Sequence, residues 1–251
     1  MILSRLVRSF RSHDWFTAAV EFVLLIAGIF IGFQIDRWSD QRLDQQRADE
    51  YRQQLISDLS IEKIDVENVI SYHEQVLTFS MTALSAWSDN PAADAEALIV
   101  AFYQASNTLP FTAARGAYDA LSDSGLIDLL GGPALTSRLS AYYGAGINDI
   151  FAEEKRYRLE LRGVMPVAVQ QRIRNDCIRI AIKETIIETL DKDCALGLSA
   201  DEAQQILGDI LKYPKMQFYL RQAISRDSIF ILLFGSRGEF IESLLTELRA
   251  L

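Results

Sequence analysis

Residues 21–38, EFVLLIAGIFIGFQIDRW, form a strongly apolar stretch near the start of this 251-residue chain. From residue 15 to residue 35 there is one charged side chain, that of Glu21. As an α-helix this segment would be about 31 Å long at ~1.5 Å per residue, which matches the hydrocarbon core of a bilayer. Trp15 and Trp38 flank it, where aromatic rings anchor a span at the headgroup level. The sequence therefore predicts a transmembrane helix over residues 15–35.

Two other interpretations of this stretch are a cleaved signal peptide and a buried core helix. The segment IGFQIDRWSD offers no small-residue A-x-A site for cleavage. The strictly uncharged run, residues 22–35, is only 14 residues long, which is short for a span and leaves the buried helix open. We favour the uncleaved anchor.

The charge distribution predicts the orientation of the chain. Arg5, Arg8 and Arg11 precede the span, so the positive-inside rule makes residues 1–14 a short cytoplasmic tail in a bacterial inner membrane. The remainder would then be periplasmic. The net charge is −9, and an acidic body opposes nucleic-acid binding, which depends on neutralising phosphates.

One face of the predicted span has the pattern of a helix-pairing surface. Two glycines four residues apart let two backbones approach closely within lipid. This face predicts a homo-oligomer, although ordinary glycine frequency and a snorkelling glutamate are simpler interpretations. Its residues, spaced by three or four, are Glu21, Leu25, Gly28, Gly32 and Ile35.

Beyond the span, the sequence predicts an all-α fold. Residues 33–90 contain neither Pro nor Gly, so a stalk helix is expected over 36–88. An irregular helical bundle is expected to follow over 89–251. Within the bundle, helices are expected over 91–106, 112–125, 133–165, 166–177, 199–212 and 214–234, with a turn at 235–238 before a last helix. Residues 177–190 alternate at first like a strand, but their later helical spacing favours a helix.

Two blocks of sequence resemble an uncharacterised bacterial family of single-pass inner-membrane proteins. The first is HDWFTAAVEFVLLIAGIFIGFQIDRW, residues 13–38, and the second is GAYDALSDSGLIDLLGGPALTSRLSAYY, residues 116–143. Together they cover about a quarter of the chain. The local sequence GGPALT departs from the polar residue that the family has before its second helix. The resemblance implies an N-terminal anchor with a helical extramembrane domain, and it implies no activity.

The residue inventory argues against an enzyme and against a bound cofactor or metal. The chain has two histidines and no CxxC pair, so it lacks the close ligand spacing of a zinc site, and His73 is expected on a solvated helix face. No GxSxG, GxGxxG or P-loop pattern occurs, and GSRG at 235–238 lacks the lysine and length of a phosphate loop.

Two further groups of residues attract attention. Cys177 and Cys194, the two cysteines of the chain, are candidates for a disulfide worth about 3 kcal/mol in an oxidising compartment, with buried free thiols as the alternative. The basic face formed by Lys155, Arg158 and Arg162 could bind an acidic partner, but interleaved glutamates favour a self-paired surface. Tyr142 and Tyr143 are expected to be packing aromatics.

These features favour a non-catalytic interaction or scaffold protein that binds an envelope protein partner. The alternative is a sensor-like ectodomain that binds a small ligand. An enzyme with carboxylates clustered only in the fold is the third possibility.

Overall fold

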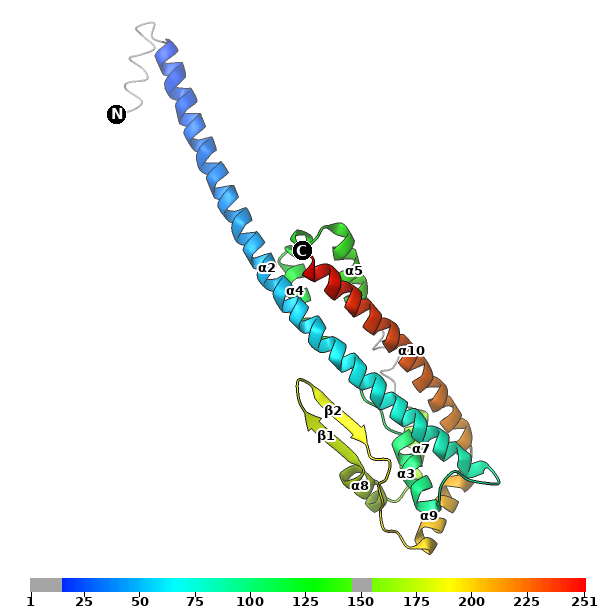
Figure 1. The fold of residues 1–251 in the computed structure, drawn as a ribbon. Coiled ribbons are helices and arrows are strands. Elements are labelled where there is room, and N and C mark those ends of the chain that lie inside the picture. The colour runs from blue at the N-terminus through cyan, green and yellow to red at the C-terminus, as the bar shows by residue number, and fades with distance from the viewer. Residues whose placement is uncertain (1–14, 146–154) are drawn as a thin grey trace.

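The computed structural model describes residues 15–145 and 155–251 and is predominantly helical (Figure 1). The predicted all-α class is confirmed, with one small hairpin added to it. In chain order the elements are α2 (Trp15–Leu84), η1 (Ser85–Trp87), α3 (Ala95–Ala105), α4 (Gly116–Asp123), η2 (Ile127–Leu129), α5 (Pro133–Gly144), α7 (Arg156–Val164), α8 (Val167–Asp176), β1 (Ile178–Ile182), β2 (Ile186–Leu190), α9 (Ala200–Lys212) and α10 (Met216–Arg249).

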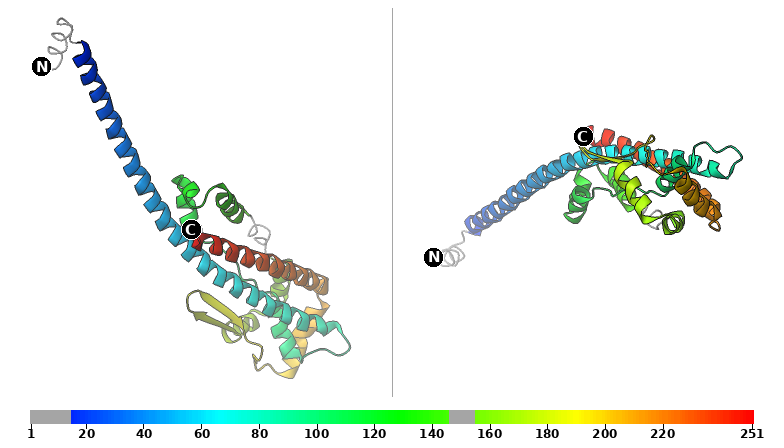
Figure 2. Two further views of the ribbon diagram at one scale, coloured as in Figure 1. Left: turned by 45° about the horizontal axis from the view of Figure 1, so that its top comes forward. Right: turned by 90° about the horizontal axis from the view of Figure 1, so that it is seen from below.

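The apolar stretch forms the first part of one continuous helix, α2. This helix has 70 residues and is thus about 105 Å long at ~1.5 Å per residue. Its N-terminal third projects away from the rest of the protein in every view (Figures 1 and 2), and its apolar side chains are exposed. By length and composition this segment can cross a membrane. The helix expected over 15–35 and the stalk helix expected over 36–88 form one continuous element, since α2 runs to Leu84 and η1 follows to Trp87.

The predicted stalk has two different parts. Leu43 remains exposed, whereas from Ala48 onward one face of α2 is buried against α10, which runs beside it in the opposite direction (Figure 1). The second part of the stalk therefore belongs to the hydrophobic core of the body. The charges on residues 36–47 explain the difference, since they leave no apolar stripe to bury.

Two hydrophobic cores lie along the pair of long helices. The first combines the last turns of α2 with α3, α7, α8, α9 and the start of α10. The second, nearer the apolar span, combines residues 48–69 of α2 with α4, α5 and residues 230–248 of α10. Two packing aromatics predicted from sequence, Tyr142 and Tyr143, are buried in this second core.

The last helix is longer than predicted. The expected turn at 235–238 is wrong, since α10 continues through both glycines to Arg249. Phe234, Arg237 and Ile241 are buried along the seam with α2, so the helical spacing of this face outweighs the helix-weakening tendency of two glycines.

Several helix ends also differ from the prediction. Helix α3 begins at Ala95, because the Asp94 carboxylate caps the backbone N–H of Ala97, and the proposed start at Pro91 is wrong. The expected single helix over 133–165 appears as α5 and α7; residues 146–154 lie outside the described part. The expected helix start at Ser199 is confirmed, and the Ser199 hydroxyl caps this helix by accepting from the N–H of Glu202.

The helix expected over 177–190 is wrong. Residues 178–182 and 186–190 form an antiparallel hairpin in which Ile182 opposes Ile186 and Ile178 opposes Leu190. The initial alternation of apolar and polar residues and the β-branched isoleucines suit a strand. The hairpin lies beside α2 (Figures 1 and 2), so contacts distant in sequence supply the partner that local spacing cannot reveal.

Candidate functional site

The residues predicted to anchor and pair the span all lie on the projecting part of α2. Trp15, Trp38, Leu25 and Ile35 are exposed by about 60% or more, with exposures of 69%, 63%, 59% and 61%. Glu21, Gly28 and Gly32 are exposed on the same segment, and no atom of the described residues lies within 4 Å of a Cβ built on either glycine. The space needed for a second helix is therefore present along this stripe, and its self-association stays a prediction.

The two cysteines meet at the base of the hairpin. Cys177 and Cys194 have their Cα atoms 5.3 Å apart and are joined by a disulfide. Neighbouring contacts attach the same region to α3: the Gln104 amide donates to the carbonyl of Cys177 at 3.1 Å. The Glu96 carboxylate accepts from the backbone N–H groups of Leu196 and Leu198 at 2.6 and 2.7 Å. The disulfide thus closes a loop that is also held by polar contacts to α3.

A buried charged cluster joins three separate segments between the two cores. The Asp227 carboxylate of α10 accepts from the Lys155 ammonium at 2.7 Å and lies 3.0 Å from Nδ1 of His73 on α2. All three side chains are at most 4% exposed. Along α2 the second core ends at Val69 and the first begins at Tyr72, so His73 lies at their junction.

Backbone oxygens complete this cluster. Lys155 also donates to the carbonyl of Asn107 at 3.0 Å, and His73 Nε2 lies 3.3 Å from the carbonyl of Leu109. The ring of Phe230 stacks on the imidazole with centroids 4.0 Å apart. Burial lowers the pKa of Lys155, while the Asp227 carboxylate opposes that shift. The expectation of a solvated His73 is therefore wrong, since its helix face is covered by α10.

The basic face predicted from sequence is also rearranged. Lys155 points inward, while Arg158 donates to the carbonyl of Ser106 at 3.2 Å. Arg162 lies 4.5 Å from the ring centroid of Tyr103 and donates to the Asn107 amide oxygen at 2.7 Å. Lys155 donates to the Asp227 carboxylate of α10, the loop after α3 supplies acceptors to Arg158 and Arg162, and Arg156 pairs with Glu160 within α7.

A second buried ion pair lies nearer to the apolar segment of α2 than the His73 cluster does. Arg237 of α10 donates to Glu62 of α2 at 2.9 Å, and the Tyr142 hydroxyl donates to the same carboxylate oxygen. The guanidinium lies 4.2 Å from the centroid of the Tyr142 ring and 4.9 Å from that of Phe111. Burial and the Glu62 carboxylate together raise the pKa of Tyr142.

Sequence reasoning missed Asp227, Glu62 and Arg237. A signal was present, because Asp227 and Arg237 occur at helical spacing with Phe230 and Phe234 on one face of α10. Charges inside an apolar stripe indicate a buried pair. Their partners on α2 and α7 are distant in sequence, so only the fold brings them together.

These two clusters join helices that are distant in sequence. Each buried carboxylate has a cationic partner, and no described residue provides a serine or cysteine nucleophile beside the imidazole of His73. Within residues 15–145 and 155–251, no group of three or more His, Cys, Asp or Glu side chains is placed to hold a metal ion.

The free side of the hairpin is its most accessible feature. The N–H of Asp191 donates to the carbonyl of Cys177, and the N–H of Lys183 donates to the carbonyl of Thr185. In this antiparallel register, residue pairs that exchange backbone hydrogen bonds alternate with pairs that do not. The backbone groups of Ile178, Ile180 and Ile182 therefore point away from β2.

The opposite edge, on β2, is occupied by α2. The N–H of Leu190 donates to the Gln75 side chain at 2.9 Å, and the Asn68 amide donates to the hydroxyl of Thr185 at 2.8 Å. On β1, by contrast, Ile180 and Ile182 are 67% and 80% exposed. The hairpin thus has one covered edge and one open, apolar edge.

Comparisons with protein-family models, with curated proteins and with solved structures find no match to this chain.

Proposed function

We propose that this protein is a single-pass, membrane-anchored interaction protein without catalytic activity, which binds an extended segment of an envelope protein partner along the free edge of β1. The observation that carries the proposal is the open edge of the hairpin. Its unpaired backbone groups match those of an added strand, and exposed isoleucines match apolar side chains on that strand.

The anchor supports the same proposal. The apolar segment of α2 is exposed throughout and continues without a break into the body, so the bilayer would supply the missing apolar environment. Arg5, Arg8 and Arg11 favour a cytoplasmic N-terminus in a bacterial inner membrane. A disulfide between Cys177 and Cys194 favours a periplasmic body, because such bonds persist in oxidising compartments.

The buried charges favour a structural scaffold over a catalyst. Lys155, Asp227 and His73 satisfy one another and nearby carbonyls, and Glu62 accepts from both Arg237 and the Tyr142 hydroxyl. Such groups position helices and keep the hairpin presented on a rigid body.

A backbone substitution tests the docking edge. The N–H of Ile180 points away from β2, so Ile180→Pro removes one partner-facing donor and leaves the β1–β2 ladder intact. The full-length protein would carry a photocrosslinking residue at exposed Ile186, on the same face. We expect a discrete crosslinked product in cells that maps to an extended segment of one partner and is lost with Ile180→Pro.

Ile180→Val is the matched control, because it keeps both the N–H and an apolar β-branched side chain, and it should retain the product. A product unchanged by Ile180→Pro, or no product at all, would contradict docking at this edge. Crosslinking between two copies of this chain would show that the β1 edge binds a second copy and not a different partner protein.

A further inference from the structure

One face of the hairpin continues the hydrophobic core. Side chains at alternate positions of a strand share a face, so Ile178, Ile180 and Ile182 of β1 lie on the same face. At the base of the hairpin Ile178 packs against the first core, and Leu190, its partner on β2, is buried there. Toward the turn the isoleucines are exposed, so this face stays apolar beyond the point where the body covers it.

The other face of β1 carries positive charge. Arg179 and Ala181 lie on this face, and the same alternation places Lys183, the residue after the strand, beside them. The strand β1 itself contains no acidic residue, and Glu184 lies at the tip of the turn. The open edge therefore has an apolar side and a cationic side.

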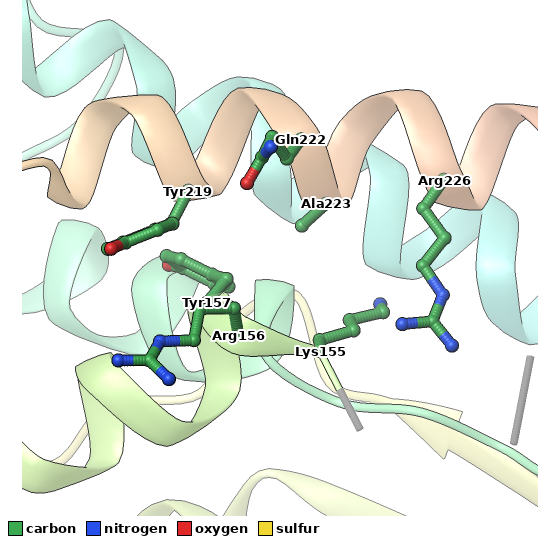
Figure 3. A pocket seen from close by; sticks show the side chains of 7 residues that line it. All are labelled: Lys155, Arg156, Tyr157, Tyr219, Gln222, Ala223 and Arg226. Carbon is green, nitrogen blue, oxygen red and sulfur yellow. The ribbon is translucent and has the colours of Figure 1, made fainter. Parts of the chain in front are cut away.

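The cations of this chain differ in how completely a carboxylate neutralises them. In the pocket between α7 and α10 (Figure 3), Lys155 and Arg156 pair with Asp227 and Glu160. Lys183, by contrast, is exposed and forms no ion pair with a carboxylate in the described part of the chain. Its ammonium is available to a carboxylate that approaches along β1.

Arg179 is only partly satisfied. Its guanidinium lies 3.2 Å from the carboxylate of Asp191, which follows β2, and its side chain is 71% exposed. A guanidinium has five N–H donors, and an exposed ion pair of this kind is weak. Because Asp191 lies on the β2 side, Arg179 keeps donors for a second carboxylate on the β1 side.

These charges disfavour a second copy of this chain at the edge. In the antiparallel pairing that opposes Ile180 with Ile182 of the other copy, Arg179 would oppose Lys183. Like charges that face each other across two strands are destabilising, whereas opposite charges stabilise the pair. An acidic residue at each of these positions of the added strand would replace the repulsion by attraction.

We propose that the segment bound at the β1 edge is amphipathic, with apolar residues that alternate with aspartate or glutamate. Its apolar side chains extend the isoleucine face, and its carboxylates pair with Arg179 and Lys183. This inference rests on the proposed function, since it names the chemistry of the strand that binds there.

Fluorescence anisotropy with short labelled peptides tests this specificity, using the full-length protein in phosphatidylcholine nanodiscs, whose lipid has no net charge. Valine alternates with glutamate, glutamine or lysine in peptides of equal length, and a further peptide has the valine–glutamate composition arranged in two blocks. We expect saturable binding of the alternating glutamate peptide, roughly tenfold tighter than the lysine peptide, with the glutamine peptide between them. The block peptide should bind more weakly, because its apolar side chains do not all lie on one face.

Lys183→Glu reverses one of the two positive charges and should abolish the preference for glutamate over lysine. Lys212→Glu is the matched control, since Lys212 is an exposed lysine on α9, and it should keep the preference. Thermal unfolding of both variants would establish that they fold. A preference for glutamate that survives Lys183→Glu would overturn this inference.

Ile180→Pro separates this inference from the proposed function. If the alternating peptides bind equally, or the lysine peptide binds more tightly, and Ile180→Pro removes that binding, then the edge binds strands but the acidic specificity is wrong. If no peptide binds, or if binding survives Ile180→Pro, then strand binding at this edge is itself wrong.

Discussion

At the scale of single residues, stability depends on a few charges placed inside apolar helix faces. Asp227 is 1% exposed and neutralises the Lys155 ammonium, whose side chain is 3% exposed. A paired buried charge adds little net stability, but a buried charge deprived of its partner is costly. We therefore expect substitution of Asp227 to lower the stability of the fold more than substitution of an exposed charge.

We predict that Asp227→Ala lowers the free energy of unfolding by about 3–5 kcal/mol, because it leaves Lys155 buried and unpaired. Denaturant unfolding of the full-length protein measures the change. Glu242→Gln, which removes the exposed partner of Lys63, should have little effect. Equal effects of the two substitutions would show that the Lys155 cluster is not held as described.

Buried tyrosines predict a loss of stability in alkali. Burial and Glu62 raise the pKa of Tyr142 above its ordinary value of 10.0. Above pH 10 the unfolded chain therefore loses this proton while the folded protein keeps it, so stability falls as pH rises through that value. Tyr142→Phe should lose stability near neutrality but decline less steeply between about pH 9 and 11. Parallel pH profiles for the two proteins would contradict this assignment.

At the scale of elements, the long helices are stabilised by packing, and their local propensity is weak in places. Helix α10 continues through Gly235 although glycine disfavours helix interiors. The β-hairpin shows the opposite situation, where the chain becomes a strand because α2 and the disulfide support it. A two-stranded hairpin alone is marginally stable in water.

We predict that Gly235→Ala raises the free energy of unfolding by roughly 0.5–1 kcal/mol, since a Cβ there meets no atom within 4 Å and alanine favours the helix. Thermal or denaturant unfolding measures the gain. Gly132→Ala should instead destabilise the protein, because Gly132 has a φ of 80°. Stabilisation by both substitutions would contradict the described backbone.

At the scale of the whole molecule, one helix connects the apolar segment to the folded body. The membrane proposal places that segment in lipid and the disulfide in an oxidising compartment. Topology and association can be tested separately, because the disulfide and the glycine stripe lie at opposite ends of the molecule.

We predict that an inner-membrane-impermeant maleimide labels Cys177 and Cys194 in intact cells only after reduction. The bond protects both thiols; after reduction in a periplasmic body the half-buried Cys194 reacts directly, whereas the buried Cys177 reacts when the surrounding core opens. Labelling that requires cell lysis and no reductant would place the body in the cytoplasm and invert the proposed orientation.

We predict that Gly28→Ile with Gly32→Ile weakens self-association of the full-length protein in bilayers, because branched side chains prevent close backbone approach along the stripe. Förster transfer between labelled copies measures it. Ala27→Ile, off the stripe, should preserve association. Unchanged Förster transfer in the Gly28→Ile, Gly32→Ile variant would contradict a role of this face in helix pairing.

Local pattern in the sequence was sufficient for the long N-terminal helix, its apolar segment, the helix start at Ser199 and the all-α class. These depend on neighbours within one or two turns, where hydrophobic spacing and capping residues act directly. The resemblance of residues 13–38 and 116–143 to a family of anchored proteins remains a prediction.

Only the tertiary structure decided where His73, Lys155 and Asp227 meet, that the second part of the stalk is core, and that residues 178–190 form a hairpin. Each of these outcomes depends on contacts between segments far apart in sequence. Burial and pairing energies at such contacts exceed local propensities of a few tenths to one kcal/mol per residue, so they override what neighbouring residues favour.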